Sequence, residues 1–385
     1  MKKTTMMILS HILTALIACA VTLFVAVSGL NAGYSKLEHL EDIIEQNYIE
    51  EYDKTEIEDA AAQAMIGALG DRWSYYIPAD EYASYREQMA NAYVGIGVTI
   101  QQRSDGQGLD VIQVSQGGPA GEVGILPGDR IIGVDGKSIL TMELEAVRSM
   151  IRGEEGTQVS ITVLRGEEEK EFSLVRKSFQ TPVAIATLLP DNIGLVTIVN
   201  FDTRCANETV AAIESLLEQG ATKLIFDVRN NPGGYKSELV QVLDYLLPEG
   251  LIFRCEYQNG KVEDDYSDEA CLDMPMAVLV NGSSYSAAEF FAAALNEYDK
   301  AVIVGQATTG KGYVQNVYQM NDGSAVGISI GRYCTPNGVS LEGVGITPEI
   351  PVDVTEEIAS QIYYGTLEPG DDPQIQAAVD ALLGR

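Results

Sequence analysis

The sequence predicts an α/β core with an inserted β-rich domain, preceded by a helical segment and an N-terminal transmembrane helix. Two observations predict this organisation. Beyond residue 179, apolar strand-like runs alternate with helix-like segments, which is typical of helices packed on a largely parallel sheet. Before that residue, short strand-like runs are separated by glycine and proline turns, which indicate a β-rich unit. The predicted parts of the 385-residue chain are residues 1–33, 34–90, 91–178, 179–355 and a helical tail, 356–385.

The first 33 residues are expected to form a cytoplasmic stub and a membrane anchor. An apolar run extends from about Met6 to Leu30, behind Lys2 and Lys3. It is long enough to span a hydrocarbon core of ~30 Å, and its positive end is expected to stay cytoplasmic, which would send the rest outward. The alternatives are a cleaved signal peptide and a lipoprotein site at Cys19. A signal peptide usually has a shorter apolar region, of ~7–15 residues, so the uncleaved anchor is favoured.

Residues 34–90 are expected to fold as helices that serve packing and carry no chemistry. The second helix is expected to begin at Thr55, which is followed three residues later by Glu58 in a capping-box pattern, and to end at Gly70. The first helix is indicated by apolar residues at helical spacing, namely Leu37, Leu40, Ile44 and Tyr48.

Residues 91–178 combine tight glycine turns with short strands. The segments YVGIGV, GPA, LPGDRII and VDG occur in that order and are followed by a helix and two closing strands. This ordered set resembles a PDZ domain of the type found in bacterial proteases. Such domains bind an extended C-terminus by strand addition, and the backbone amides of a glycine loop hold the carboxylate. The resemblance implies that Val94, Gly95, Ile96 and Gly97 form this loop; the alternative is a turn that binds nothing.

The remainder of the chain reads as alternating strands and helices. Strands are expected at Ile193–Val199, Lys223–Val228, Met276–Val280, Ala301–Val304 and Val314–Tyr318. Helices are expected at Asn207–Glu218, Lys236–Leu246, Ala287–Leu295 and in the tail between Asp372 and Leu383. This order predicts one α/β layer with its helices packed on the sheet.

Three loops stand at strand ends, where α/β sheets place their sites. They are DVRNNPGG at residues 227–234, NGSSYSAAE at residues 281–289 and GKGYVQ at residues 310–315. Two glycines at a helix start suit an oxyanion because they expose backbone N–H groups, although such a loop is more often only a tight turn. A serine at a helix N-terminus is usually just a cap, so a functional role needs support from its context.

The third loop also matches part of a phosphate-binding loop, through Gly305, Gly310 and Lys311. Phosphate binding is disfavoured because Gly312 stands where a Ser or Thr should hold the metal, and because a strand rather than a helix is expected next. A lysine between glycines in an apolar stretch still requires a reason, since a buried charge is costly.

The composition excludes several kinds of site. The net charge of −31 argues against a nucleic-acid partner, because phosphate binding needs a basic face. The two histidines, His11 and His39, lie near the start, which excludes Ser-His-Asp, Cys-His and His-based zinc sites from the rest of the chain. The cysteines beyond the anchor lack metal-binding spacing and are either ordinary thiols or include a Cys255–Cys271 disulfide.

The three loops together carry a family resemblance. The strings DVRNNPGG, VLVNGSSYSAAEFFAAAL and VGQATTGKGYVQ resemble the C-terminal processing peptidases, also called tail-specific proteases. The similarity extends from about residue 36 to the end and includes GDRWSYYIPADEY and DPQIQAAVDALL. It implies a crotonase/ClpP-like core in which Ser286 is the nucleophile, Lys311 the general base and Gln315 the residue that orients the lysine. It also implies oxyanion-hole amides at Ala287 and at either Gly233 or Gly234.

Two positions depart from the family's usual SASASE pattern. Tyr285 replaces a small residue before Ser286, and Ala288 replaces a second serine after it. The bulky Tyr285 leaves the peptide preference open, and it makes Ser284 a rival nucleophile.

A serine and a lysine suffice for this chemistry without a histidine. A serine hydroxyl needs a base within reach, and lysine can be that base only when it is neutral. Its reference pKa of ~10.4 must fall by about 3, a differential of ~4 kcal/mol, and burial shifts the pKa in that direction. The amide of Gln315 could bond the amine without adding charge, whereas a carboxylate there would stabilise the protonated lysine.

The predicted function is that of a membrane-anchored, outward-facing serine endopeptidase. It would cleave exported proteins near their C-termini through an acyl-enzyme, with the PDZ-like domain recognising the substrate C-terminus. The resemblance implies no cofactor and no metal; the expected partners are a protein or peptide substrate and the membrane, and a homo-oligomer is left open. The rivals are a binding protein on an inactive protease fold, and an esterase or amidase, which the peptide-end recognition domain argues against.

Overall fold

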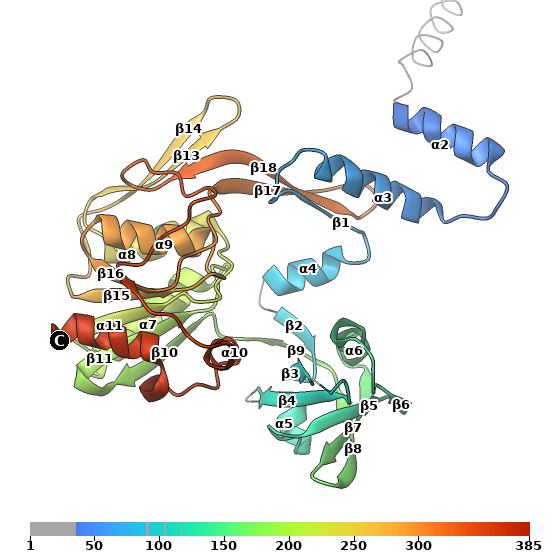
Figure 1. Cartoon of the computed structure of the whole chain (residues 1–385), viewed down its shortest axis with the longest axis horizontal. Helices are drawn as coiled ribbons and strands as arrows, with labels where there is room; N and C mark the ends of the chain where they lie inside the picture. The colour runs from blue at the N-terminus through green and yellow to red at the C-terminus, as the bar shows by residue number, and fades with distance from the viewer. Residues whose placement is uncertain (1–35, 90–91, 104, 116) are drawn as a thin grey trace, which may run out of the picture. The chain divides into compact units, whose positions relative to one another are not determined.

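The computed structural model describes residues 36–385 apart from 90–91, 104 and 116 (Figure 1). The predicted membrane anchor, residues 1–33, lies outside the described residues. Among the helices that are described, none combines the length and the apolar character needed to cross a membrane. The chain divides into two compact units, residues 1–61 and 62–385.

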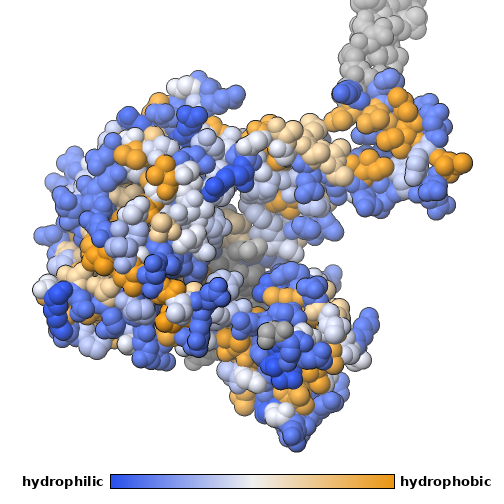
Figure 2. All heavy atoms as spheres, viewed as in Figure 1, coloured by the Kyte–Doolittle hydropathy of each residue, from blue (hydrophilic) through white to orange (hydrophobic). Residues whose placement is uncertain are grey.

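The helical segment before the β-rich domain contains three described helices and one short strand. They are α2 (Lys36–Asn47), α3 (Lys54–Gly67), β1 (Tyr75–Ile77) and α4 (Tyr82–Met89). The predicted cap at Thr55 is wrong: the carboxylate of Asp53 accepts the backbone N–H groups of Thr55 and Glu56 instead. The expected packing face of α2 is also not buried within the described chain, and Leu40 is 51% exposed. Figure 2 shows apolar side chains on the surface of this segment.

The β-rich domain is built around an antiparallel sheet in the strand order β3-β4-β5-β7-β8, with β6 paired to β5. One edge of this sheet is β3, and a separate ribbon pairs β2 with β9. Alternate residues of the strands point inward, so that Ile131, Ile161 and Val163 form a closed apolar core with Val147 of α6. The elements are β2 (Ala92–Gly95), β3 (Val98–Gln102), β4 (Leu109–Val114), α5 (Pro119–Val123), β5 (Arg130–Val134), β6 (Lys137–Ser138), α6 (Leu144–Ile151), β7 (Gln158–Arg165), β8 (Glu168–Val175) and β9 (Lys177–Gln180).

The α/β core contains a sheet in the strand order β10-β11-β12-β15-β16-β19. All neighbouring pairs from β11 to β19 are parallel, and only β10 is antiparallel to its neighbour, which confirms the predicted largely parallel layer. The elements are β10 (Ala184–Leu189), η1 (Pro190–Asn192), β11 (Ile193–Ile198), α7 (Cys205–Glu218), β12 (Lys223–Asp227), α8 (Lys236–Leu246), β15 (Met276–Val280), α9 (Ala287–Glu297), β16 (Ala301–Gly305), β19 (Ile350–Pro351), α10 (Glu356–Tyr364), η2 (Pro369–Asp371) and α11 (Pro373–Leu383).

The central strands of this sheet, β11, β12, β15 and β16, are buried on both faces, as their continuous apolar sequences require. In β12, Leu224 and Phe226 pack toward α7, α8 and α9, whereas Ile225 between them packs toward α11. Figure 1 shows α9 and α11 on opposite sides of β15 and β16. The sheet is therefore a fixed platform whose strand ends hold the connecting loops in place.

A second sheet beside the core has the order β1-β18-β13-β14, with β17 also paired to β18. Its strands in the core segment are β13 (Gly250–Tyr257), β14 (Val262–Ser267), β17 (Tyr313–Gln319) and β18 (Ala325–Cys334). The prediction that Val314–Tyr318 belongs to the α/β layer is wrong, because this strand pairs antiparallel with β18. Its sequence mixes apolar and polar residues, unlike the continuous apolar runs of the buried parallel strands.

The cysteines of the described chain are all free thiols: Cys205, Cys255, Cys271 and Cys334. The Cys255–Cys271 disulfide, left open by the sequence, is therefore not formed. Cys255 is fully buried in β13 opposite Tyr333 and behaves as a small core residue.

Candidate active site

The three loops singled out in the sequence lie at one edge of the parallel sheet. They follow β12, β15 and β16, which are neighbours in the sheet and run in the same direction. The carboxyl ends of parallel neighbours meet at one edge, so residues far apart in the sequence are brought together there. The sheet thus places the glycine loop, the serine loop and the lysine loop beside one another.

Ser286 occupies the turn between β15 and α9. Its backbone angles are φ 58° and ψ −126°, a combination that residues other than glycine rarely adopt. Its backbone N–H donates to Glu289 Oε2 at 2.9 Å. A strained backbone at a strand-to-helix turn is a frequent property of functional residues, because the surroundings must hold it in place.

Glu289 connects the serine loop to the lysine loop, and sequence reasoning missed this role. The side chain is fully buried. Its Oε2 atom accepts the backbone N–H groups of Ser286, at 2.9 Å, and of Lys311, at 2.8 Å. Its Oε1 atom accepts the backbone N–H of Gly310 at 2.7 Å and the hydroxyl of Thr308 at 2.5 Å. A glutamate three residues after a helix-capping serine was the available signal, but it predicts only the bond to Ser286.

The side-chain amine of Lys311 is half-buried and lies near two aromatic rings. Its Nζ atom donates to Gln315 Oε1 at 2.6 Å. The same atom lies 5.1 Å from the ring centroid of Trp73 and 5.7 Å from that of Tyr285. Burial lowers the pKa of Lys311, and the nearby carboxylates oppose this shift only in part. The lysine is therefore biased toward the neutral amine.

Gln315 meets Lys311 although the two do not share a strand. The sequence spacing suggested one strand face for both, but β17 begins only at Tyr313, and its pairing with β18 is irregular between Val314 and Gln315. The amide is held on its other side as well, because Gln315 Nε2 donates to the backbone carbonyl of Trp73. Trp73 lies 242 positions away in the sequence, and it was not predicted to be near the site.

The glycine loop lies directly against the serine loop. Gly233 has φ +87°, and a Cβ atom there would come within 2.8 Å of the Ser286 Cβ and 2.9 Å of the Ala287 nitrogen. A Cβ atom on Gly234 would come within 2.3 Å of the Phe201 carbonyl oxygen. Neither position can carry a side chain, and this explains the glycine pair physically. The N–H of Gly233 donates to Asn231 Oδ1 at 2.8 Å, so that amide already has a partner.

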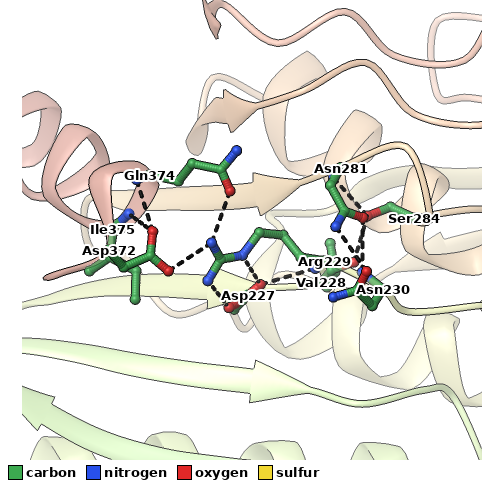
Figure 3. Close-up of polar contacts among 9 residues, drawn as sticks. All are labelled: Asp227, Val228, Arg229, Asn230, Asn281, Ser284, Asp372, Gln374 and Ile375. Carbon is green, nitrogen blue, oxygen red and sulfur yellow. Dashed lines mark hydrogen bonds and ion pairs between the residues drawn. The ribbon is translucent and has the colours of Figure 1, made fainter. Parts of the chain in front are cut away.

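The rival nucleophile Ser284 is built into the loop rather than presented to a substrate. It is fully buried, and its hydroxyl donates to the Val228 carbonyl at 2.7 Å (Figure 3). The same hydroxyl accepts the backbone N–H of Asn281, whose side chain in turn bonds Asn230. These contacts give Ser284 a structural role: it ties the serine loop to the glycine loop.

A buried ionic cluster supports the start of the glycine loop (Figure 3). Arg229 lies between the carboxylates of Asp227, at 2.6 Å, and Asp372, at 2.8 Å. It also donates to Gln374 Oε1 at 2.9 Å. Asp372 caps α11 by accepting the backbone N–H groups of Gln374 and Ile375. The last helix is thus bound directly to the loop that bears the glycine pair.

A small pocket opens beside Ser286. Five of its eight lining residues are apolar or aromatic and one is a lysine, so it can accept an uncharged side chain. The lining residues are Gly234, Lys236, Leu239, Phe253, Ser286, Ala287, Phe290 and Tyr333.

The predicted carboxylate-binding loop, Val94–Gly97, lies in the β-rich domain. Its first two residues end β2, and its last two connect β2 to the edge strand β3. Within it, the carbonyls of Ile96 and Gly97 accept backbone N–H groups of Ala120 and Ser115, which fixes the loop against the start of α5.

Comparisons with known proteins agree with this architecture. A family model described as "Peptidase family S41" matches residues 192–352, and one described as "PDZ domain" matches residues 111–165. A carboxy-terminal processing protease, CtpA of Bacillus subtilis, is 32% identical over 358 residues, which cover 90% of this chain and 76% of that protein. A probable CtpA-like serine protease of Staphylococcus aureus is 32% identical over 375 residues, which cover 94% of this chain and 75% of that protein.

Solved structures show the same likeness. The photosystem II D1 C-terminal processing protease is 28% identical with a TM-score of 0.50, over 83% of this chain and 87% of that chain. A putative S41 protease from Bacteroides fragilis has a TM-score of 0.60 over 91% of this chain and 98% of that chain; at 17% identity, it supports the fold alone.

The buried carboxylate of Glu289 yields a stability prediction. Glu289→Gln replaces one acceptor oxygen with an NH₂ group that must face backbone donors, so the free energy of unfolding is expected to fall by ~2–3 kcal/mol. Denaturant titration measures the loss. The matched control is Glu214→Gln on the exposed face of α7, where a change within ~0.5 kcal/mol is expected. Equal stability of the two variants would contradict the role assigned to Glu289.

Proposed function

This chain belongs to the carboxy-terminal processing proteases of peptidase family S41, and from that premise we propose that Ser286 and Lys311 form its catalytic dyad. The observation that carries the proposal is the environment of Lys311. Its amine is half-buried, its hydrogen-bond partner is a neutral amide, and its backbone is bound to the same carboxylate oxygen as that of Ser286. A lysine held in this way can be neutral beside a serine, as a general base must be.

The proposed reaction is acyl transfer in two steps. The neutral amine of Lys311 takes the proton of the Ser286 hydroxyl while the Oγ atom attacks the scissile carbonyl. The ammonium then protonates the leaving amine as the peptide C–N bond breaks, which leaves an ester on Ser286. In the second step the amine takes a proton from water, and the resulting hydroxide attacks the ester carbonyl. The ammonium then protonates the Ser286 oxygen as the ester C–O bond breaks, which releases the acid product and restores the Ser286 hydroxyl and the neutral amine.

The oxyanion of each tetrahedral intermediate needs backbone donors beside Ser286. We assign this role to the N–H groups of Ala287 and Gly234, which line the pocket together with Ser286. The N–H of Gly233 is the weaker candidate because it already donates to Asn231. The pocket itself would receive the substrate side chain on the acyl side of the cleaved bond, and its apolar wall favours an uncharged residue there.

The PDZ domain would recognise the substrate C-terminus. Strand β3 lies at a sheet edge and can accept an added strand, and Val94–Gly97 directly precedes it. In this mode the backbone amides of Gly95, Ile96 and Gly97 would hold the terminal carboxylate. Recognition of the tail, followed by cleavage near it, fits a protease that acts on C-termini.

The location is proposed from the sequence. The apolar run of residues 6–30 behind two lysines would hold the enzyme in the membrane, with the catalytic part outside the cytoplasm. The substrates would then be exported proteins. An inactive binding protein is disfavoured because Ser286, Lys311 and Gln315 all carry the functional groups that the chemistry needs.

Two substitutions test the dyad. With a reduced, unfolded protein as substrate, Ser286→Ala and Lys311→Met are expected to lower kcat by at least ~10³-fold and ~10²-fold, because nucleophile and base are lost. The rates are read from product masses over time, after circular dichroism has shown that the variants fold. Ser283→Ala, an exposed serine of the same loop, and Lys137→Met, an exposed lysine, serve as controls with unchanged rates. Wild-type rates in either dyad variant would remove that residue from the mechanism.

The lowered pKa of Lys311 predicts the pH dependence. The neutral amine is the active form, so kcat/KM should rise with pH as Lys311 loses its proton. Because burial lowers this pKa, the midpoint of the rise should lie well below the ordinary value of 10.5. The measurement is kcat/KM for one peptide over a range of pH. A midpoint at the ordinary value, or no rise at all, would exclude a buried lysine base.

A pair of peptides tests the role of the PDZ domain. They share one sequence with an apolar cleavage site and differ only in a free or an amidated C-terminus. The amidated peptide lacks the negative charge that the loop amides would bind, so its kcat/KM is expected to be ~10-fold lower than that of the free acid. The difference between the two peptides should disappear once the PDZ loop is blocked by Gly97→Glu. Equal cleavage of both peptides by the wild type would mean that the terminal carboxylate is not recognised.

A further inference from the structure

Trp73 is the only tryptophan of the chain, and it makes two contacts with the lysine loop and a third with Glu342. Its backbone carbonyl accepts a hydrogen bond from Gln315 Nε2. Its indole N–H donates to both carboxylate oxygens of Glu342, at 2.9 and 3.1 Å. Its ring centroid lies 5.1 Å from the Nζ atom of Lys311.

The carbonyl of Trp73 determines which way the amide of Gln315 faces. A glutamine amide has an oxygen that accepts and a nitrogen that donates. Since a carbonyl only accepts, it selects the nitrogen of Gln315, and the amide oxygen must then face Lys311, where it accepts from Nζ at 2.6 Å. A neutral amine has two N–H groups and one lone pair. Donation to Gln315 orients the amine and leaves the lone pair free to take a proton.

The ring of Trp73 covers the amine together with Tyr285, the residue that departs from the family pattern. The two rings stack at a centroid distance of 6.4 Å and an interplanar angle of 22°. Their centroids lie 5.1 and 5.7 Å from Nζ of Lys311, so they occupy space that water would otherwise fill. The ring faces attract the ammonium form, whereas the exclusion of water disfavours it. Burial has the largest influence on the pKa of Lys311, and it lowers that pKa.

The segment that carries Trp73 is held on both sides. Asp71 accepts the backbone N–H of Trp73 at 3.0 Å, and the Arg72 guanidinium lies 4.1 Å from the indole centroid. Glu342, which accepts the indole N–H, also accepts the backbone N–H of Gly312 at 2.8 Å. Strand β1 then follows and pairs with β18, which also pairs with the strand that bears Gln315. Trp73 therefore has little freedom to move away from the amine.

We propose that Trp73 is a positioning residue for Lys311: its carbonyl orients Gln315, and its ring, with that of Tyr285, keeps water from the amine. This inference rests on the proposed function, in which the neutral Lys311 is the base. The charged groups that face Lys311 are the carboxylates of Asp71, Glu342 and Glu289, and all three favour its protonated form. The aromatic cover acts in the opposite direction from these charges.

Substitution of the Trp73 ring tests whether the residue positions Lys311 or only packs beside it. Trp73→Ala admits water to the amine and leaves the three carboxylates in place. The acid limb, which is the pH range over which kcat/KM rises as Lys311 loses its proton, should therefore move to higher pH. The rate below the midpoint should fall about tenfold for each pH unit of that shift, with little change in KM. Trp73→Phe keeps a ring and should restore the wild-type limb. Tyr318→Ala, an exposed aromatic of β17, is the matched control and should leave the limb unchanged.

Removal of a negative charge near Lys311 should shift the acid limb in the opposite direction. Glu342→Gln keeps an acceptor for the indole and removes one carboxylate that favours protonated Lys311, so the limb should move to lower pH. If Trp73→Ala lowers the rate and leaves the limb where it is, the positioning role is overturned. If the wild type does not cleave any substrate, the proposed function fails instead.

The fluorescence of Trp73 provides a readout that needs neither activity nor a Trp73 variant. With a single indole in the chain, emission excited at the red edge of the absorption band reports this residue alone. Protonation of Lys311 beside the ring should change the emission with the same midpoint as the acid limb, and the change should be absent in Lys311→Met. An emission that titrates identically in wild type and Lys311→Met would show that the ring does not sense the amine, and would contradict the proposal.

Discussion

The buried carboxylate of Glu289 holds together the two loops on which the site depends. The loops follow different strands and are separated in the chain by α9 and β16, and each contributes one member of the proposed dyad. A carboxylate with two oxygens can accept several N–H and O–H donors at once, and here it binds donors from both loops. Because it is fully buried, water does not compete for these bonds. This carboxylate stabilises the unusual backbone angles of Ser286, because it accepts a hydrogen bond from the backbone N–H of that residue.

Two further structural features hold the three loops of the site in place. The parallel sheet is buried on both faces and sets the strand ends from which all three loops begin. The buried Arg229 cluster attaches the glycine loop to α11, which packs on the face of the sheet opposite α9 (Figures 1 and 3). Buried ion pairs contribute little net stability, but breaking one leaves an uncompensated charge, so such a cluster specifies geometry more than it adds stability.

Hydrophobic periodicity was sufficient to predict the parallel layer, and the family resemblance singled out Ser286, Lys311 and Gln315, whose roles remain a proposal. The sequence was insufficient where contacts depend on distant parts of the chain. Three of the four bonds of Glu289, the bond of Ser284 to Val228 and the approach of Trp73 all arise from folding across longer separations. Strand β17 was assigned to the wrong sheet for a related reason: periodicity predicts a strand, but its pairing partner β18 is chosen by tertiary structure.

The attachment of Arg229 to Asp372 and Gln374 has a consequence for the order of events during synthesis. Gln374 lies 145 positions after Arg229 in the sequence. Until the segment that forms α11 has been synthesised, Arg229 lacks one of its two carboxylates, so the glycine loop is without that support. The loop that bears the glycine pair therefore gains its full support only after a segment far downstream of it has folded.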